Sequence, residues 1–126
     1  MTEGVVDLYL VPKSWGIVNI VVMKFKDPAN AFLYKISFSS NRTWAQKVAL
    51  RFIYKYGKVK EARHENGRYP PILRFEFPES KLGLILATKH IKYKHKSKIE
   101  KLINEGKEDE LEREIITIGI SEVLNE

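Results

Sequence analysis

The sequence predicts a mixed α+β fold in which an antiparallel sheet of five to six strands is combined with one internal helix and two C-terminal helices. Apolar and polar residues alternate with a period of two along most of residues 5–38, as they do in strands. Residues 43–56 instead repeat their apolar positions with the period of a helix. The 126 residues are enough for one domain, 1–126, that buries a core without disulfides or metal.

The first third of the chain predicts a three-stranded antiparallel meander. Residues 5–11 alternate between two faces until a proline stops them, and residues 16–26 form a longer β-rich run after the connection at 12–15. Residues 27–30 are typical of a turn, and residues 32–38 alternate again. Strands joined by such short connections pair most simply with their neighbours in the sequence.

A helix is expected directly after this meander. Thr43 and Gln46 fit a capping box, in which each side chain satisfies a free backbone N–H group of the other residue. The apolar face that follows must be buried, and the helix is expected to run to about Tyr56 and to close on Gly57.

Two to three further strands are predicted before the C-terminal helices. Residues 58–65 alternate weakly and lead into Asn66-Gly67, a dipeptide that favours a tight hairpin. Residues 72–77 form the next strand after two prolines. Residues 82–91 place leucines at alternate positions after another turn, so they are predicted to be a strand as well.

Two helices are predicted at the C-terminal end. Ser97 and Glu100 fit a second capping box, and the helix that begins there should end at Gly106. The acids at 108–110 suit the first turn of a last helix, because they face the positive end of its dipole. Gly119 leaves the extent of this last helix open.

Composition excludes several classes of protein. The chain has no cysteine, which excludes disulfides, thiolate metal sites and cysteine nucleophiles. The N-terminal residues do not read as a signal peptide, and the longest apolar run is too short to cross a bilayer. We therefore expect a cytoplasmic protein without a membrane partner. Glutamine occurs once while Lys and Glu are abundant, a bias typical of hyperthermophile proteins.

The uneven distribution of charge is the main guide to function. Residues 1–99 carry 19 Lys or Arg against 7 Asp or Glu, a net +12, whereas residues 100–126 carry 3 against 9, a net −6. Residues 89–98 hold five lysines, two histidines and a tyrosine without an acid. Such a run repels itself, and nucleic acid is the commonest polyanion that it could meet.

The predicted partner is therefore nucleic acid, DNA or RNA without distinction, and two basic elements form the candidate surface. Three cations spaced by four residues share one face of the first helix, and the lysine run lies at a strand-to-helix junction. The free N–H groups and the dipole of a helix N-terminus favour phosphate there, and tyrosines could stack on unpaired bases. A face using six to eight of these cations should lose roughly 10³-fold in affinity between low and moderate salt. The candidate binding residues are Lys47, Arg51, Tyr54, Lys55, Lys58, Lys89, Lys92, Tyr93, Lys94, Lys96 and Lys98.

Simpler explanations exist for the same cations. The basic helix face could be an ordinary solvated face, and exposed lysines could protect a sheet edge from pairing with another chain. A third alternative is an assembly protein, in which the acidic segment 105–114 docks on the basic face of another copy as a homodimer or on that of a partner. The same acidic segment could also pair with the basic face of its own chain.

A metal-dependent nuclease or phosphodiesterase is the enzymatic alternative, although the sequence predicts no catalytic residue, metal site or cofactor. Glu79 and Lys81 have the spacing that such nucleases use to hold Mg²⁺ beside a lysine, but they fall in a predicted turn. A metal site would have to draw on the few acids of the basic part, for which charge balance is the simpler explanation. These acids are Asp7, Glu61, Glu76 and Glu79, with His64 as a further candidate.

Residues 43–100 resemble double-stranded RNA-binding domains in their expected element order, α-β-β-β-α, over about half of the chain. Residues 94–98 precede the later helix as that family's basic cluster does. The sequence IEKLI at 99–103 stands where that family has an alanine-rich helix face, and three strands precede the segment. The resemblance is one of layout and does not make the chain a member of the family.

Overall fold

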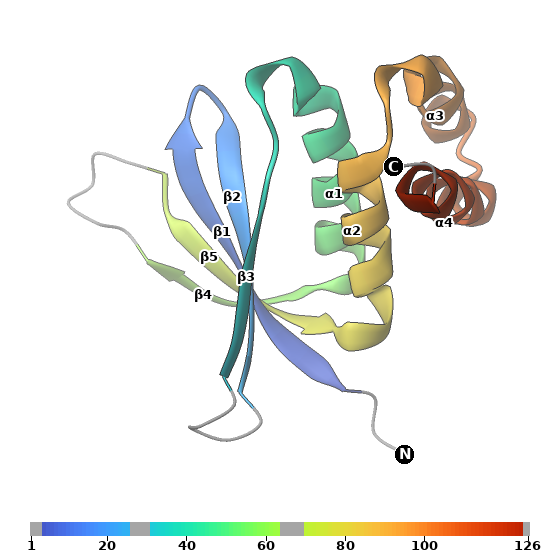
Figure 1. Cartoon of the computed structure of the whole chain (residues 1–126). Helices are drawn as coiled ribbons and strands as arrows, with labels where there is room; N and C mark the ends of the chain where they lie inside the picture. The colour runs from blue at the N-terminus through green and yellow to red at the C-terminus, as the bar shows by residue number, and fades with distance from the viewer. Residues whose placement is uncertain (1–3, 26–30, 64–69, 125–126) are drawn as a thin grey trace.

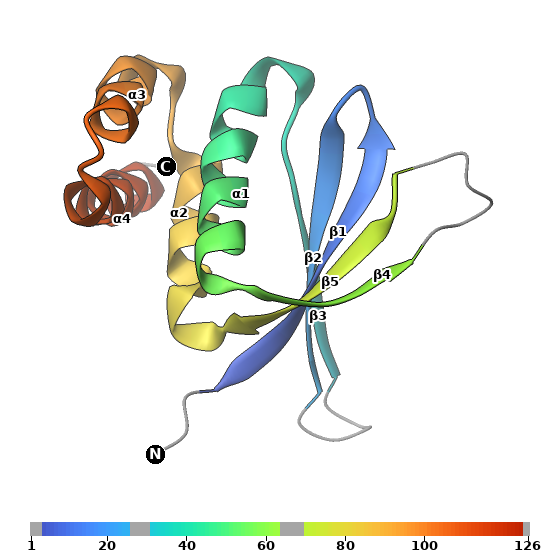
Figure 2. The same ribbon diagram turned by 180° about the vertical axis from the view of Figure 1, so that it is seen from behind.

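An antiparallel sheet forms one layer of the fold, and helices are stacked on one of its faces in two further layers (Figures 1 and 2). The structure is a computed structural model that describes residues 4–25, 31–63 and 70–124. The predicted turns at 27–30 and at Asn66-Gly67 lie outside the described residues. In chain order the elements are β1 (Val5–Ser14), β2 (Ile17–Phe25), β3 (Ala31–Ser37), η1 (Ser40–Arg42), α1 (Thr43–Tyr56), β4 (Lys58–Arg63), β5 (Ile72–Pro78), η2 (Glu79–Lys81), α2 (Leu82–His90), η3 (Tyr93–His95), α3 (Lys96–Asn104) and α4 (Glu108–Leu124), where η marks a short 3₁₀ helix.

The sheet confirms the predicted α+β class and the N-terminal meander. Within the described residues it has five strands in the order β3-β2-β1-β5-β4, and every neighbouring pair is antiparallel. Leu8 of the central strand β1 pairs with Val22 of β2 on one side and with Phe75 of β5 on the other. All three side chains are fully buried and face the helices, so the meander and the β4–β5 hairpin share one core.

Strand β1 continues through Pro12 to Ser14, beyond the predicted stop at the proline. A proline cannot donate a backbone hydrogen bond, and it is tolerated where a strand has no partner on that side. The pairing of β1 with β5 ends at Leu10, whereas Pro12 is paired with Val18 of β2 alone. Pro12 therefore lies where β1 has become an edge.

Helix α1 separates two apolar cores. Its Ala49 and Ile53 pack on the sheet, while its Phe52 faces away from the sheet. Phe52 belongs to a second core with residues of α2, α3 and α4, among them the fully buried Ile99 and Ile115. Helices α3 and α4 thus form an outer layer that packs on α1 and α2, and none of the described helices covers the other face of the sheet (Figure 1).

The prediction of a strand at residues 82–91 is wrong, because this segment forms helix α2. Ile85 joins the core on the sheet and Leu84 joins the core under α3 and α4, so this helix is buried on two sides. A helix that is apolar on most sides lacks the one-faced pattern by which helices are recognised. The resemblance to double-stranded RNA-binding domains ends here, since α1 is followed by two strands and then by helices alone.

Neither predicted capping box forms. No side chain caps α1 or α3, and both helices follow directly on a 3₁₀ turn. Ser97 lies inside the first turn of α3 and not before it. The 3₁₀ turn that precedes α3 is closed by a backbone hydrogen bond from His95 N–H to Lys92 O, at 3.0 Å. Helix α1 ends at Tyr56 as predicted, but Gly57 has an ordinary φ of −82°. A Cβ atom at Gly57 would lie 2.5 Å from Ile53 O, so close packing rather than backbone conformation requires the glycine.

Helix α4 continues through Gly119 to Leu124. A glycine inside a helix is destabilising by about 1 kcal/mol relative to alanine, so its presence requires a packing reason. A Cβ atom at Gly119 would lie 2.5 Å from the Cβ atom of Ala87 in α2. Gly119 is therefore required because α2 and α4 pack against each other here with no room for a side chain. None of the described helices has the length and apolar character that crossing a membrane requires.

Candidate nucleic-acid interface

The two predicted basic elements meet at one cleft, between α1 and the start of α3. The cleft has a volume of about 420 Å³. Helix α1 carries cations there because its opposite side is fixed in the two cores, and α3 begins where the lysine run ends. The polar and aromatic residues that line the cleft are Thr43, Trp44, Lys47, Arg51, Lys96 and Glu100.

Arg42 fixes the lysine run against the N-terminal end of α1. Its guanidinium donates hydrogen bonds to the backbone oxygen of Lys89, at 2.6 Å, and to that of Ile91. Its charged carbon also lies 5.9 Å from the centre of the Trp44 ring, within the range of a cation–π contact. Arg42 therefore joins the end of α2 to α1 and determines where the chain leaves for α3.

Tyr93 adds an exposed aromatic ring beside the cleft. It packs edge-on against Trp44, with ring centroids 6.4 Å apart and an interplanar angle of 85°. The Tyr93 side chain is nevertheless 70% exposed, and the Lys96 ammonium lies 5.4 Å from its ring. A ring with one edge fixed and most of its surface in solvent can stack on a planar ligand.

Two lysines of the cleft keep their positive charge available. Lys47 is exposed and has no ion-pair partner in the part of the chain that the structure describes. Among the described residues, the acid paired with Lys96 is Glu100, at 3.8 Å, in an exposed pair with a spacing of four residues. Such pairs contribute about 0.3–0.5 kcal/mol, so an incoming phosphate can compete for the lysine.

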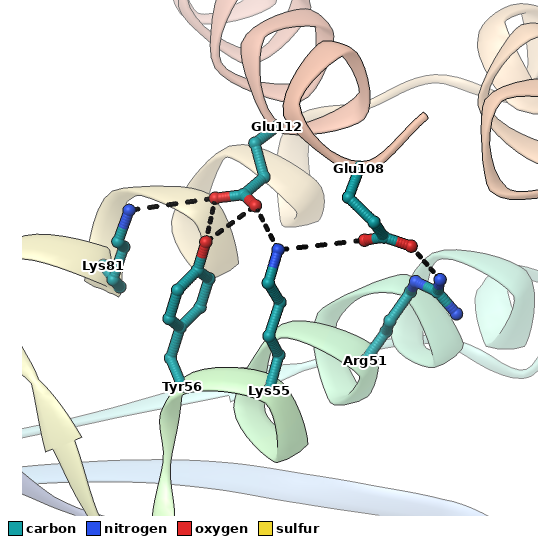
Figure 3. Close-up of polar contacts among 6 residues, drawn as sticks. All are labelled: Arg51, Lys55, Tyr56, Lys81, Glu108 and Glu112. Carbon is teal, nitrogen blue, oxygen red and sulfur yellow. Dashed lines mark hydrogen bonds and ion pairs between the residues drawn. The ribbon is translucent and has the colours of Figure 1, made fainter. Parts of the chain in front are cut away.

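Helix α4 neutralises the remaining cations of α1. Arg51 is paired with Glu108, and the Lys55 ammonium lies 2.7 Å from Glu112 (Figure 3). Glu112 also accepts a hydrogen bond from the Tyr56 hydroxyl, at 2.5 Å, and lies 3.8 Å from Lys81. The acidic start of α4 therefore occupies the basic helix face of its own chain. The homodimer stays a prediction. It depended on these acids, and fewer of them are free to contact a second copy because Glu108 and Glu112 are paired within the chain.

The Glu112 carboxylate is held in its charged form at neutral pH. Burial of this side chain raises its pKa, but the hydrogen bonds from Lys55 and Tyr56 outweigh that effect and leave the pKa below the ordinary value. The same hydrogen bond raises the pKa of Lys55. The pair is thus ionised across the physiological range and joins α4 to α1.

The lysine run is partly neutralised by α4 as well. Lys92 and His95 lie 3.0 and 3.1 Å from the buried carboxylate of Glu122, and Lys94 lies 3.9 Å from it. The hydrogen bonds from Lys92 and His95 hold the pKa of Glu122 below its ordinary value. Lys98 is paired with Glu114 at 2.9 Å. One carboxylate shared by two lysines leaves net positive charge beside the cleft.

The other predicted binding residues lie elsewhere. The Tyr54 ring packs edge-on against Phe75 at 5.5 Å and does not line the cleft, and Lys58 lies on β4 at the far end of α1. Lys89 is exposed in the last turn of α2. The lysine run therefore lies at a helix-to-helix junction, through η3, rather than at the predicted strand-to-helix junction.

The acids considered for a metal site are in ion pairs. Glu79 pairs with Lys24 at 2.6 Å, whereas Lys81, two residues later, faces α4. The pairs Asp7–Arg74, Glu61–Arg63 and Lys60–Glu76 hold the remaining three acids. Among the described residues, no group of three or more His, Asp or Glu side chains could hold a metal ion. His64 lies outside the described residues.

Sequence reasoning missed three residues of this end of the molecule. Gln46 was assigned to a cap, but its buried side chain bonds Val18 N–H at 3.0 Å and Gly16 O at 2.8 Å. The sequence patterns predict no role for Trp44, and they place Trp15 only in the connection at 12–15. The available signals were the lone glutamine of the chain and a Trp-Gly dipeptide where a tight hairpin ordinarily has Asn-Gly or Asp-Gly.

The cleft therefore contains two available lysines and a single weakly paired acid, and an exposed tyrosine stands beside it. In comparisons with known proteins, no family model, no curated protein and no solved structure matches the chain. Its function must be inferred from its own residues.

Proposed function

We propose that the chain binds nucleic acid, and that the cleft between α1 and α3 is the main contact surface. The observation that carries the proposal is the position of Lys47 and Lys96, which come from different elements and line one cleft. Tyr93 stands beside this cleft with 70% of its side chain exposed. Ammonium groups that neutralise phosphates, together with an exposed ring, are the usual means of binding a nucleic-acid strand without reading its sequence.

The ion pairs of α4 limit the strength of the interaction. Because Arg51, Lys55 and Lys98 are engaged within the chain, three to four phosphate contacts are a better expectation than six to eight. Affinity for duplex DNA should then fall by roughly 40- to 150-fold when the salt concentration is raised from about 50 to about 200 mM, and affinity for a single strand by roughly 20- to 50-fold. Binding is expected in the micromolar range at low salt, with little preference for sequence.

Removing both lysines of the cleft is expected to weaken binding by roughly tenfold or more at about 50 mM salt, because two phosphate contacts are lost. The variant is Lys47→Gln with Lys96→Gln. The slope of log affinity against log salt should become less negative by about 2. Fluorescence anisotropy of labelled single- and double-stranded DNA and RNA measures both quantities.

A matched control separates the cleft from general electrostatics. Lys35 is exposed and without an ion-pair partner among the described residues, like Lys47, and Lys101 faces Glu105 at 3.9 Å with a spacing of four residues, like Lys96 with Glu100. Lys35→Gln with Lys101→Gln therefore removes the same net charge outside the cleft, and its affinity should stay within about twofold of wild type. If both double variants bind nucleic acid equally weakly, the cleft is not the main contact surface. A wild-type protein that retains no nucleic acid at micromolar concentration and low salt would overturn the proposal itself.

A further inference from the structure

The tip of the β1–β2 hairpin carries an exposed tryptophan. Ser14 pairs with Ile17, so the loop consists of Trp15 and Gly16 alone. Both residues have positive φ, 54° for Trp15 and 76° for Gly16, as in the type I′ turn that joins two twisted strands. The Trp15 side chain is 96% exposed.

Folding does not account for a tryptophan at this position. The left-handed backbone region is unfavourable for a bulky side chain, and Asn, Asp or Gly ordinarily occupies the first position of this turn. Because Trp15 is 96% exposed, it buries almost no apolar surface that could offset this unfavourable conformation. Unfavourable backbone conformations that persist without such a compensation tend to occur at functional sites.

The hairpin tip is held on the N-terminal part of α1, the helix that forms one side of the cleft. Gln46 of α1 bonds the backbone of Gly16 and Val18, and its side chain is only 3% exposed. Lys47, the next residue, lines the cleft. Figures 1 and 2 both show the β1–β2 hairpin ending beside the N-terminal end of α1. Trp15 is therefore presented at the same end of the molecule as the cleft.

The surroundings of Trp15 favour an anionic ligand with a planar part. A groove of about 630 Å³ runs along the hairpin, and Lys13 and Arg63 line it together with Trp15. No acid is among the described residues that line this groove. Arg63 donates its Nε hydrogen to Glu61 at 2.8 Å, which leaves its other N–H groups for a phosphate. A base that stacks on the ring would carry its phosphate towards these cations.

We infer that Trp15 stacks on an unpaired base, and that the chain therefore binds single-stranded nucleic acid more tightly than a duplex. Bases inside a duplex are already stacked on one another and cannot offer a face to the ring, whereas every base of a single strand can. The inference rests on the proposed function and adds to it the class of nucleic acid that is preferred.

The test is Trp15→Asn, since asparagine tolerates positive φ and suits the turn. Binding of a fluorescein-labelled 15-nucleotide oligothymidine is expected to weaken by roughly tenfold, the loss of one stacked base. Binding of a duplex of equal length should change by less than twofold, and the melting temperature should not fall. Trp15→Phe should retain most of the single-strand affinity. Trp15→Gly, which also suits the turn, is the second variant if the asparagine protein folds poorly.

The outcomes separate this inference from the proposed function. Equal loss of single-strand and duplex binding in Trp15→Asn, or no loss in either, would overturn the role of Trp15 while the cleft variants could still support nucleic-acid binding. Wild-type protein that binds neither probe overturns both. In a Trp44→Phe background the emission of Trp15 should be quenched by oligothymidine, and unchanged emission at saturation would contradict stacking.

Discussion

Gln46→Ala is expected to lower the free energy of unfolding by about 2–3 kcal/mol, because two hydrogen bonds that hold the β1–β2 hairpin on α1 are lost. The Gln46 side chain is 3% exposed, and its amide accepts from Val18 N–H and donates to Gly16 O. Alanine removes both bonds and leaves a part-buried N–H group without a partner, which is more costly than the loss of an exposed hydrogen bond. Urea unfolding followed by circular dichroism measures the change.

Lys47→Ala is the matched control for this prediction, because it truncates the neighbouring exposed side chain on the same helix. Its free energy of unfolding should stay within about 0.5 kcal/mol of wild type. A Gln46→Ala protein as stable as the Lys47→Ala protein would show that the glutamine does not hold the hairpin on α1.

Glu112→Gln is expected to lower the free energy of unfolding by about 1–3 kcal/mol at neutral pH, since a charged acceptor is replaced by a neutral one. The substitution keeps the size of the side chain but removes the charge that faces Lys55, Tyr56 and Lys81. The matched control is Glu110→Gln, which removes the same charge from an exposed residue in the first turn of α4. This variant should lower the free energy of unfolding by less than about 1 kcal/mol.

The loss caused by Glu112→Gln should depend on pH. Because the folded-state pKa of Glu112 is lowered, its contribution is fully present above the ordinary glutamate pKa of about 4.3 and disappears as pH falls through the folded value. The difference in stability between wild type and variant should thus be constant from about pH 6 to 8 and shrink below about pH 4.3. A difference that grows on acidification would contradict the assigned contacts.

The strands and the amphipathic helices could be predicted from the sequence alone. Alternation places Val6, Leu8 and Leu10 on one side of β1, and these residues are buried in the core. Helix α1 was found because its apolar residues recur on one side of the helix, and the acids at its start identified α4. These patterns arise from local geometry, so one sequence is enough to reveal them.

Contacts between distant segments could not be predicted in this way. The sequence of α2 resembles that of a strand because the helix is buried on two sides, by the sheet and by α3 and α4. The burial by α3 and α4 cannot be read from the residues of α2 alone. Pairing of the acidic segment with the basic face of its own chain was only one of several alternatives, because Glu108 and Glu112 lie more than fifty residues from the cations that they contact. Gln46 matched a local cap, but its partners lie 28 and 30 residues earlier in the chain.

The position of the nucleic-acid surface can be measured directly by titrating ¹⁵N-labelled protein with oligothymidine and following the backbone amide resonances. The largest shifts are expected in residues 43–51 of α1 and 93–103 of η3 and α3, with the hairpin tip at Trp15 and Gly16 shifting as well. Shifts confined to the open face of the sheet or to the C-terminal half of α4, or the absence of shifts at low salt, would contradict the account.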